Sequence, residues 1–357
     1  MVNLTNRYLD LAFEKAKINL GSTKSNPSVG CVVEKDGSVI SSGYTSIGGR
    51  PHAEFNALNK KVNFKNANLY VSLEPCSHFG KTPPCVGLII KKKIKKVFFP
   101  KQDPNLITSG KSFKILKRNG IKVKSNLKVN RFNNFYRSYI INIKKNSPLI
   151  DAKIAISKDL FTKNTTTKLI TNKNSRNVGN YLRSEYDALI TTYKTINDDN
   201  PSFDCRIDGL RHKSPDLIII DRNLKIKKKL KIFEKKLKRK IFLITSSNNQ
   251  KKIKFLKSKK INVIYFKKLE AKEDFQGLFI FLKKKGHSRI FVESGVKFLS
   301  FLIMNNFIHN IYVFVSKNQI KKKGKKSIKG NIRKRLKLNR MVHINLDGDK
   351  LFKERLL

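Results

Sequence analysis

Three potential zinc ligands and one acid lie within a short part of the chain. His52, Cys76 and Cys85 are residue types that bind zinc, and Glu54 follows the histidine closely. A zinc ion with three protein ligands keeps its fourth position for water and lowers the pKa of that water toward neutrality. In zinc deaminases a nearby Glu that is not a ligand moves the proton from the water to the departing amine. The pattern therefore predicts a zinc site for hydrolytic deamination, with Glu54 as the catalytic acid and base.

A helix start and a strand end should position these residues. Pro51 is typical of a helix start, and residues two apart on a helix do not share a face, so Glu54 should not become a further ligand beside His52. The alternating apolar residues of 68–73 predict a strand that ends just before Cys76. A helix beginning at the same point would favour the thiolate. Each residue alone could be a surface histidine or a buried cysteine, but the three together favour zinc.

The spacing of the two cysteines separates classes of deaminase. Deaminases that act on tRNA, DNA or free cytosine usually carry Pro-Cys-x-x-Cys, whereas eight residues, 77–84, separate Cys76 from Cys85. The string EPCSHFGKTPPC at 74–85 resembles the deaminase of riboflavin biosynthesis, as do NPSVG at 26–30 and QDPN at 102–105. The resemblance covers nearly the whole N-terminal half and implies a cytidine-deaminase-like fold with three α/β/α layers.

The same resemblance implies which residues contact the substrate. They are Asn26 and, on the loop between the two cysteines, His78, Lys81 and Thr82. Lys81 could instead be an ordinary surface charge.

Length and composition limit the class of protein. The chain has 357 residues, of which 39% are hydrophobic, so it can form two domains with a core each. Four cysteines, two of them assigned to zinc, argue against a disulfide framework and indicate a reducing cytosol. The first twenty residues fit an amphipathic helix rather than a secretion signal, and no apolar stretch is long enough for a membrane span. We therefore expect a cytoplasmic protein.

The formal net charge of +53 raises the question of a nucleic-acid partner. Neutralisation of phosphates by Lys and Arg dominates nucleic-acid affinity. Here, however, the lysine runs at 91–93, 227–229 and 321–323 are spread along the chain, without interleaved aromatic residues for base stacking. The pattern favours a compositional bias with nonspecific attraction to polyanions, and no specific nucleic-acid partner.

Alternating strands and helices predict an α/β domain over residues 1–145, with its sheet covered on both faces. After an opening helix, strands at 29–34 and 39–44 should form a hairpin through Asp36 and Gly37. Helices are expected after Pro51, after Pro84 and at 111–118, and strands at 68–73, 97–99 and 121–123. The charged and proline-containing segment 144–148 reads as a linker.

A second α/β domain is expected over residues 149–357. Its predicted strands are 149–156, 188–191, 217–220, 241–244, 263–266, 290–292 and 311–315. The strand at 289–293 turns at Gly295 into a helix, the place where open α/β sheets bind dinucleotide phosphates. A single glycine is also compatible with a plain strand-to-helix turn.

Four strings in this half resemble the reductase of the riboflavin pathway, which ordinarily follows the deaminase in one chain. They are KIAISKD at 153–159, Leu182-Arg183, DALI at 187–190 and TINDDNPSFDCR at 195–206. The resemblance implies a dihydrofolate-reductase-like fold that uses NADPH to reduce a ribosyl group to ribityl.

The resemblance also assigns site residues in the second half. The residues implied for NADP are Ala155, Leu169, Thr195, Asp199, Arg222, Gly295, Val296, Lys297, Phe298, Leu299, Ser300 and Phe301. Those implied for the substrate are Thr167, Arg183, Phe203, Arg206 and Glu293. Two guanidinium groups can grip a ribose phosphate, and Asp199 could relay a proton during hydride transfer. Without the resemblance, the two arginines would be read as surface charges and Asp199 as a turn residue.

Three strings depart from the family's usual residues. Residues 157–160 read Ser-Lys-Asp-Leu instead of Ser-Leu-Asp-Gly, residues 169–171 read Leu-Ile-Thr instead of Trp-Ile-Thr, and residues 315–317 lack an expected proline. They leave open an alternative in which the reductase half is only structural, and a nucleic-acid deaminase is less favoured still. The favoured interpretation is a bifunctional enzyme with one zinc ion per chain and NADPH, acting on a phosphorylated pyrimidine. The resemblance further suggests a homodimer or tetramer built through the reductase half.

Overall fold

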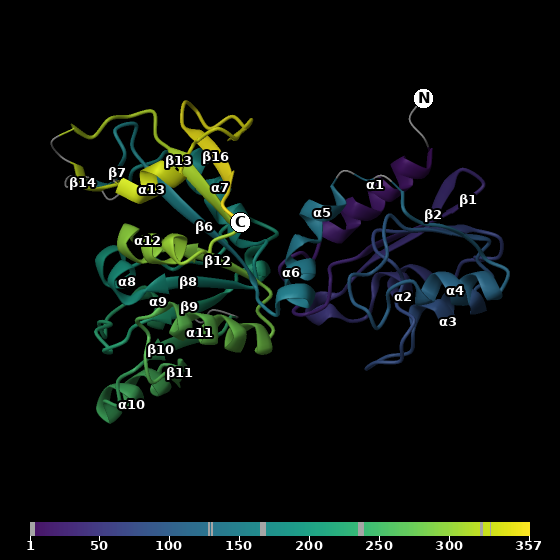
Figure 1. The fold of residues 1–357 in the computed structure, drawn as a ribbon, viewed down its shortest axis with the longest axis horizontal. Coiled ribbons are helices and arrows are strands. Elements are labelled where there is room, and N and C mark those ends of the chain that lie inside the picture. Colours follow the sequence, from purple (N-terminus) through teal and green to yellow (C-terminus); the bar gives the residue numbers. More distant parts are fainter. Residues whose placement is uncertain are drawn as a thin grey trace. The chain divides into compact units, whose positions relative to one another are not determined.

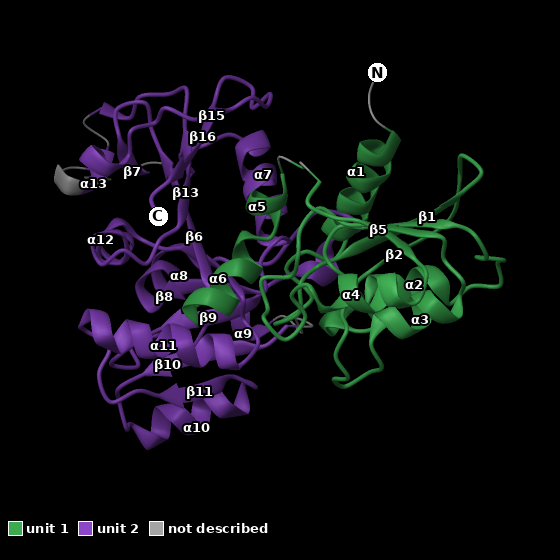
Figure 2. Ribbon diagram, turned by 45° about the vertical axis from the view of Figure 1, so that its right-hand side comes forward, with its two compact units in different colours: residues 1–147 green, residues 148–357 purple. Residues whose placement is uncertain are grey.

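The computed structural model describes residues 4–127, 129, 131–164, 169–234, 239–321, 324–328 and 330–357. The chain forms two compact units, Met1–Ser147 and Pro148–Leu357 (Figure 2). No helix among the described residues is long and apolar enough to cross a membrane.

The first unit is built on a five-stranded sheet. The strand order is β2 (Ser38–Tyr44), β1 (Gly30–Lys35), β3 (Asn68–Val71), β4 (Lys96–Phe98) and β5 (Lys122–Lys124). The hairpin of β1 and β2 is antiparallel, as is the β1–β3 pair, whereas β3, β4 and β5 run parallel. The predicted hairpin is confirmed. Strand β3 ends two residues earlier than expected, because at Ser72 the backbone N–H of Gly30 donates to the side-chain hydroxyl of Ser72 instead of continuing the ladder between backbone groups.

Helices cover both faces of this sheet, as expected (Figure 1). On one face α1 (Leu4–Lys17) places Leu9 and Ala12 against Val32 and Tyr70. On the other face lie α2 (Ala53–Leu58), α3 (Cys85–Lys91) and α4 (Lys111–Arg118). Two further helices, α5 (Phe132–Phe135) and α6 (Arg137–Lys145), complete the unit, and the sequence prediction had missed both. The unit therefore has the three α/β/α layers that were predicted.

The second unit is built on a nine-stranded sheet. The order is β11 (Asn262–Tyr265), β10 (Ile241–Thr245), β9 (Asp216–Ile220), β8 (Ala188–Thr192), β12 (Arg289–Glu293), β6 (Leu149–Ile156), β13 (Asn310–Val315), β16 (Lys350–Arg355) and β15 (Met341–Val342). The first seven strands are parallel, and β16 pairs antiparallel with both β13 and β15. A separate ribbon pairs β7 (Phe161–Asn164) with β14 (Gly324–Ser327). The seven predicted strands are present, whereas β7, β14, β15 and β16 were not anticipated.

The parallel strands bury side chains on both faces, as parallel sheets usually do. Consecutive residues of β9, such as Leu217 and Ile218, belong to different hydrophobic clusters. One cluster includes residues of α11 (Lys272–Lys284) and α12 (Val296–Met304), and the other includes residues of α7 (Lys173–Arg183), α8 (Tyr193–Asp199) and α10 (Gln250–Ser258). Two short helices, α9 (Lys231–Glu234) and α13 (Gly330–Arg335), and the 3-10 turns Ile47–Gly49 and Arg211–Lys213 complete the described elements.

Candidate active sites

The three predicted zinc ligands meet in the first unit. Nδ1 of His52 lies 3.5 Å from Sγ of Cys76 and 3.5 Å from Sγ of Cys85. The three ligand atoms lie within 4.8 Å of one another, and among the described residues this is the only such group of three or more His, Cys, Asp or Glu side chains. One imidazole and two thiols at this separation fit a zinc ion and leave one tetrahedral position for another group.

Two helix starts bring the ligands together. His52 is the N-cap residue of α2, and Cys85 is the first residue of α3. The thiol of Cys76 accepts the backbone N–H of Cys85 at 3.3 Å, so this sulfur lies at the positive end of α3. Hydrogen bonds from Cys85 and from His52 lower the pKa of Cys76 to about 4. The polypeptide itself thus favours the thiolate that a zinc ion requires.

Glu54 lies in the first turn of α2 and is 4% exposed. Burial, followed by the negative charge of Cys76, raises the pKa of Glu54 to about 7. The side chain is close enough to His52 and Cys85 for their charges to act on one another. A buried carboxyl group beside three ligands is the arrangement that the sequence predicted.

The loop between the two cysteines contacts segments that lie close to the ligands in the sequence or in space. Nδ1 of His78 lies 3.1 Å from Oγ1 of Thr108, and Thr82 accepts a hydrogen bond from the Arg50 guanidinium. Lys81 is exposed on the same loop. The sequence prediction had not included Arg50, although its place directly before Pro51 and His52 was a signal that could have identified it.

Two further contacts hold the surroundings of the loop. The amide of Asn26 donates to the carbonyl of Gly49 at 3.0 Å, next to Arg50. The carboxylate of Glu74, which is 3% exposed, accepts the backbone N–H groups of Asp103 at 2.9 Å and Gly110 at 3.0 Å. Since Glu74 lies just before Cys76, it ties the segment that carries Thr108 to the segment that carries a ligand.

The second unit contains a cavity of about 1030 Å³ at the carboxyl ends of β6, β8, β9 and β12. Open α/β sheets bind their ligands at this edge. Ten of the twelve residues predicted for NADP line the cavity: Ala155, Leu169, Thr195, Asp199, Arg222, Gly295, Val296, Lys297, Phe298 and Phe301. Gly295 is the N-cap residue of α12, so the start of this helix faces the cavity.

The other two residues of that set lie elsewhere. Leu299 is 1% exposed and packs in the hydrophobic core, because its position on α12 points toward the sheet. Ser300 is not among the residues that line the cavity. Thr167, predicted for the substrate, lies outside the described residues.

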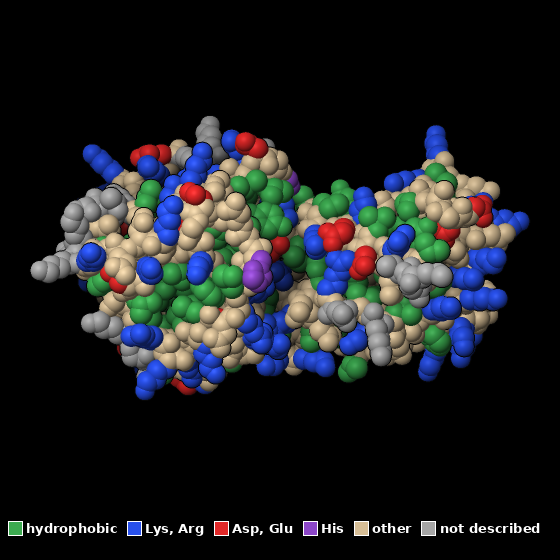
Figure 3. All heavy atoms as spheres, turned by 90° about the horizontal axis from the view of Figure 1, so that it is seen from above, with side chains coloured by type: hydrophobic (Ala, Val, Ile, Leu, Met, Phe, Trp, Pro, Cys, Tyr) green, Lys and Arg blue, Asp and Glu red, His purple; other side chains and the backbone are tan. Residues whose placement is uncertain are grey.

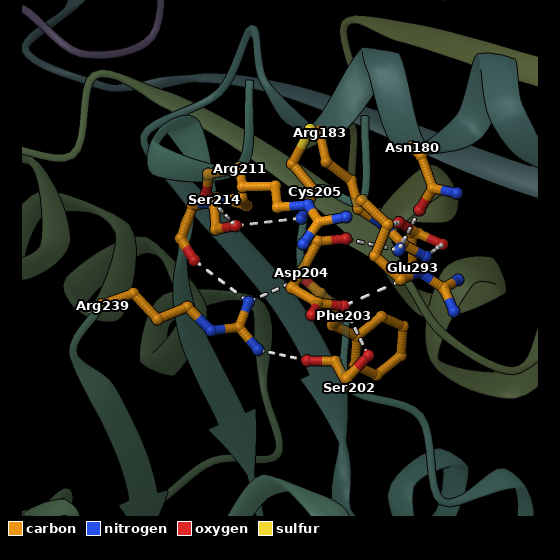
Figure 4. Close-up of polar contacts among 12 residues, drawn as sticks. Asn180, Arg183, Ser202, Phe203, Asp204, Cys205, Arg211, Ser214, Arg239 and Glu293 are labelled. Carbon is orange, nitrogen blue, oxygen red and sulfur yellow. Dashed lines mark hydrogen bonds and ion pairs between the residues drawn. The ribbon is translucent and has the colours of Figure 1, made fainter. Parts of the chain in front are cut away.

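Among the predicted substrate residues, Phe203 and Glu293 line the cavity, whereas Arg183 is not a lining residue. Arg183 instead contacts neighbouring residues (Figure 4). The Arg183 guanidinium donates to the Glu293 carboxylate at 2.5 and 3.0 Å, and both side chains are nearly buried. It also donates to the side chain of Asn180 at 2.9 Å and to the carbonyl of Asp204 at 3.0 Å. Arg183 is therefore not the surface charge that the residue pattern alone suggested.

Arg206 has a different environment. Its side chain is 59% exposed, and its Nε lies 3.8 Å from the Asp204 carboxylate. It is not among the cavity-lining residues.

Lys153 is a cavity residue that the site prediction omitted. In the parallel register of β6 and β12 it lies opposite Glu293, and it lines the same cavity. Burial lowers the pKa of Lys153 from its usual 10.5, while the charge of Glu293 acts in the opposite direction. Lys153 begins the string KIAISKD, so the resemblance to the reductase contained the signal for it.

Two of the segments that depart from the family's usual residues, 157–160 and 169–171, lie in the unit that contains this cavity. Leu160 has a φ of 70°, in the left-handed region that favours glycine, and the amide of Leu160 bonds the carbonyl of Ser157 at 2.9 Å. The turn thus keeps the backbone that the family's glycine readily adopts. Leu169, where the family has Trp, lines the cavity and is 58% exposed. Leu160 packs against the hydrophobic core and Leu169 lies at the cavity, and the cavity is present with both substitutions.

Comparisons with known proteins agree with both units. Residues 3–101 match the family model described as the cytidine and deoxycytidylate deaminase zinc-binding region. Residues 148–345 match the model of the RibD C-terminal domain. Fold and site together define a bifunctional enzyme, a zinc-binding deaminase joined to a reductase of the NADPH-using type.

Relatives with both domains are found over most of the chain. Riboflavin biosynthesis protein RibD of Aquifex aeolicus is 34% identical over 312 residues, covering 87% of this chain and 86% of its own. The RibD of Actinobacillus pleuropneumoniae is 29% identical over 87% of this chain and 82% of its own. The chain belongs to the RibD family of riboflavin biosynthesis proteins.

Solved structures give the same result for the fold. The diaminohydroxyphosphoribosylaminopyrimidine deaminase/5-amino-6-(5-phosphoribosylamino)uracil reductase of Thermotoga maritima superimposes with a TM-score of 0.83 at 26% identity. A form of Acinetobacter baumannii RibD gives a TM-score of 0.81 at 26% identity, and each comparison covers 98% of both chains.

Proposed function

We propose that the chain first deaminates 2,5-diamino-6-(5-phosphoribosylamino)pyrimidin-4(3H)-one and then reduces the ribosyl group of the resulting uracil derivative to ribityl. The observation that carries the proposal is the group of His52, Cys76 and Cys85 beside the buried Glu54, in a chain whose second unit has a nucleotide-sized cavity. The name of the Thermotoga maritima structure gives the corresponding pair of activities for a protein with the same two domains.

In the first unit, His52, Cys76 and Cys85 would hold the zinc ion. Zinc supplies a Lewis acid that makes water a nucleophile at neutral pH. Glu54 takes the proton from the attacking water and delivers it to the leaving amine, which departs as ammonia. Asn26, His78, Lys81 and Thr82 contact the substrate beside the site, and Arg50 fixes Thr82.

In the second unit, the start of α12 at Gly295 and the other residues of the predicted NADP set that line the cavity bind the cofactor. NADPH supplies the hydride, and the protein supplies a proton and the orientation of the ribosyl group. Lys153 is better placed than Asp199 to supply that proton, because it lies beside Glu293 on the central strand β6, whereas Asp199 is exposed at the end of α8. Phe203 and Glu293 contact the substrate where they line the cavity, and Arg183 acts through its hydrogen bonds to the Glu293 carboxylate. Thr167 and Arg206 are the other proposed substrate contacts.

The test is a two-step assay on the purified, zinc-loaded chain. The diamino-pyrimidinone phosphate should release ammonia, and added NADPH should then be oxidised in equal amount. Glu54→Gln should keep zinc and stop ammonia release, yet still reduce substrate that has been deaminated beforehand. Lys153→Met should release ammonia and oxidise no NADPH, while Asp199→Asn should retain most of the reduction.

The same assay separates the alternative of a deaminase with a structural second unit. Ammonia release without NADPH oxidation by the unaltered chain would favour that alternative, since Leu160 and Leu169 replace residues usual for the family. Absence of both reactions would contradict the proposal.

We also propose that the protein acts in the cytoplasm as a homodimer or tetramer built through the second unit, without a specific nucleic-acid partner. Light scattering after size-exclusion chromatography measures the mass of the assembly. A mass equal to one chain of 41.1 kDa would contradict the oligomer.

A further inference from the structure

Arg239 is a partly buried arginine outside the cavity whose donors point at backbone carbonyls (Figure 4). Its Nη1 donates to the carbonyls of Phe203 at 2.6 Å and Pro215 at 3.2 Å, and its Nη2 donates to the carbonyl of Ser202. The guanidinium thus joins the loop 201–205 to the segment that enters β9. A planar group with donors in a fixed fork can reach three carbonyls at once, and a lysine ammonium cannot reproduce that geometry.

The loop that Arg239 holds has an unfavourable backbone. Phe203 has a φ of 53°, in the left-handed region, which is unusual for a bulky residue. Such a conformation persists only where surrounding contacts determine it. The hydrogen bonds of Arg239 to the carbonyls of Ser202 and Phe203 lie on both sides of the Phe203 backbone N and Cα. They therefore stabilise the left-handed conformation of Phe203.

The same loop determines the substrate end of the cavity. Phe203 lines the cavity, and its ring lies 5.5 Å from the Arg183 guanidinium. The carbonyl of the next residue, Asp204, accepts a hydrogen bond from Arg183, which in turn holds the Glu293 carboxylate. A chain of direct contacts therefore runs from Arg239 through the loop to both cavity residues predicted for the substrate.

The charge on Arg239 persists at neutral pH. Burial lowers the pKa of its guanidinium to about 10, with the Asp204 charge acting in the opposite direction. Its Nε is buried and has no hydrogen-bond partner among the residues that the structure describes. Within the described structure, the guanidinium therefore acts through the backbone carbonyls that its Nη1 and Nη2 reach.

We propose that Arg239 is a positioning residue for the reductase, which sets substrate affinity by fixing loop 201–205 without touching substrate or cofactor. The proposal rests on the proposed reductase function. It predicts a selective effect, because the residues assigned to NADP on α12 receive none of the Arg239 hydrogen bonds.

The experiment compares Arg239→Met, Arg239→Lys and Arg211→Met in the full-length, zinc-loaded protein. Arg211 is a matched control, because it lies near the same loop but its side chain is 73% exposed and its ion-pair partner is the exposed Asp208. For each variant one measures KM and kcat for the deaminated substrate, the Kd of NADPH by fluorescence, and ammonia release by the first unit.

Arg239→Met should raise KM by about 10- to 100-fold, since small displacements of positioning groups have effects of this size. Its NADPH Kd and ammonia release should stay within about twofold of the unaltered chain, well below the factor of 10 that 1.4 kcal/mol represents. The KM of Arg239→Lys should lie between those of the unaltered chain and Arg239→Met. The KM of Arg211→Met should equal that of the unaltered chain.

An unchanged KM in a folded Arg239→Met variant would overturn the proposal, as would parallel loss of substrate and NADPH affinity. If Arg239→Met does not fold, the test uses Arg239→Ala in the presence of methylguanidinium, which can replace the missing guanidinium. The proposal then requires that the KM of Arg239→Ala falls as methylguanidinium is added and that this fall saturates. Failure of the unaltered chain to oxidise NADPH would instead contradict the proposed function.

Discussion

At the scale of single residues, His287 shows how burial controls a charge. This side chain is 7% exposed, its Nε2 lies 3.9 Å from the Asp216 carboxylate and its Nδ1 lies 4.0 Å from that of Asp187. Burial lowers the pKa of His287 from its usual 6.5, with Asp216 acting in the opposite direction and Lys240 in the same direction. The folded second unit therefore binds this proton less readily than the unfolded chain does.

This difference predicts a pH dependence of stability. The contribution of neutral His287 to the free energy of unfolding should be fully present above the pKa of His287 in the unfolded chain, near 6.5. It should be lost as the pH falls through the lower pKa of His287 in the folded chain. Urea unfolding of the second unit, followed by hydrogen exchange at the amides of Ser288 and Arg289, should show less stability at about pH 5.5 than at about pH 7.5. His287→Gln should reduce this loss, whereas the exposed His212→Gln should not. Equal losses in all three proteins would contradict the assignment.

At the scale of elements, the contact of α1 with β1 depends on a missing side chain. A Cβ on Gly30 would lie 1.9 Å from the carbonyl oxygen of Ala12 and 2.6 Å from the amide nitrogen of Ala16. Backbone atoms cannot move aside as a flexible side chain can. The helix would have to leave the sheet, and with it the packing of Leu9 against Val32.

Gly30→Ala should therefore lower the unfolding free energy of the first unit by about 3 kcal/mol or more, at the upper end of overpacking effects. Gly87→Ala is the matched control in the same unit, because a Cβ there meets no atom within 4 Å and the residue lies on the exposed side of α3. That variant should gain up to about 1 kcal/mol from helix propensity. Chemical denaturation of both variants measures the difference, and similar stabilities would refute the close helix–sheet contact.

At the scale of the whole molecule, the net charge of +53 dominates the surface. Lys and Arg side chains are spread over the face seen in Figure 3, on both units, with few acidic side chains among them. Like charges at this density repel one another and destabilise the compact state.

Salt should therefore stabilise the protein. Raising NaCl from about 20 mM to about 200 mM shortens the screening length from roughly 20 Å to roughly 7 Å, so the Tm should rise over this range. Polyanions should bind at the low concentration and dissociate at the high one, without a change in either activity once they are removed. A Tm that is constant or falls with salt would show that repulsion is not the controlling effect.

The sequence by itself determined the patterns that depend on neighbours along the chain. The residue types and spacing of His52, Cys76 and Cys85 predicted the zinc group. Asp36 and Gly37 between two apolar segments predicted the hairpin of the first unit, and short apolar segments predicted the seven strands of the second. These features follow from spacing and local periodicity, which a linear sequence states directly. The positions of α5, α6 and the C-terminal strands were missed, because their short apolar segments lack such a pattern.

Only the tertiary structure decided which distant residues meet. Glu293 pairs with Lys153 because β12 lies beside β6, although 132 residues separate the two strands. For the same reason Arg183 binds Glu293 and Arg239 binds the loop of Phe203. Strand order and register arise from packing of the whole core, so no local pattern encodes which side chains the sheet brings together.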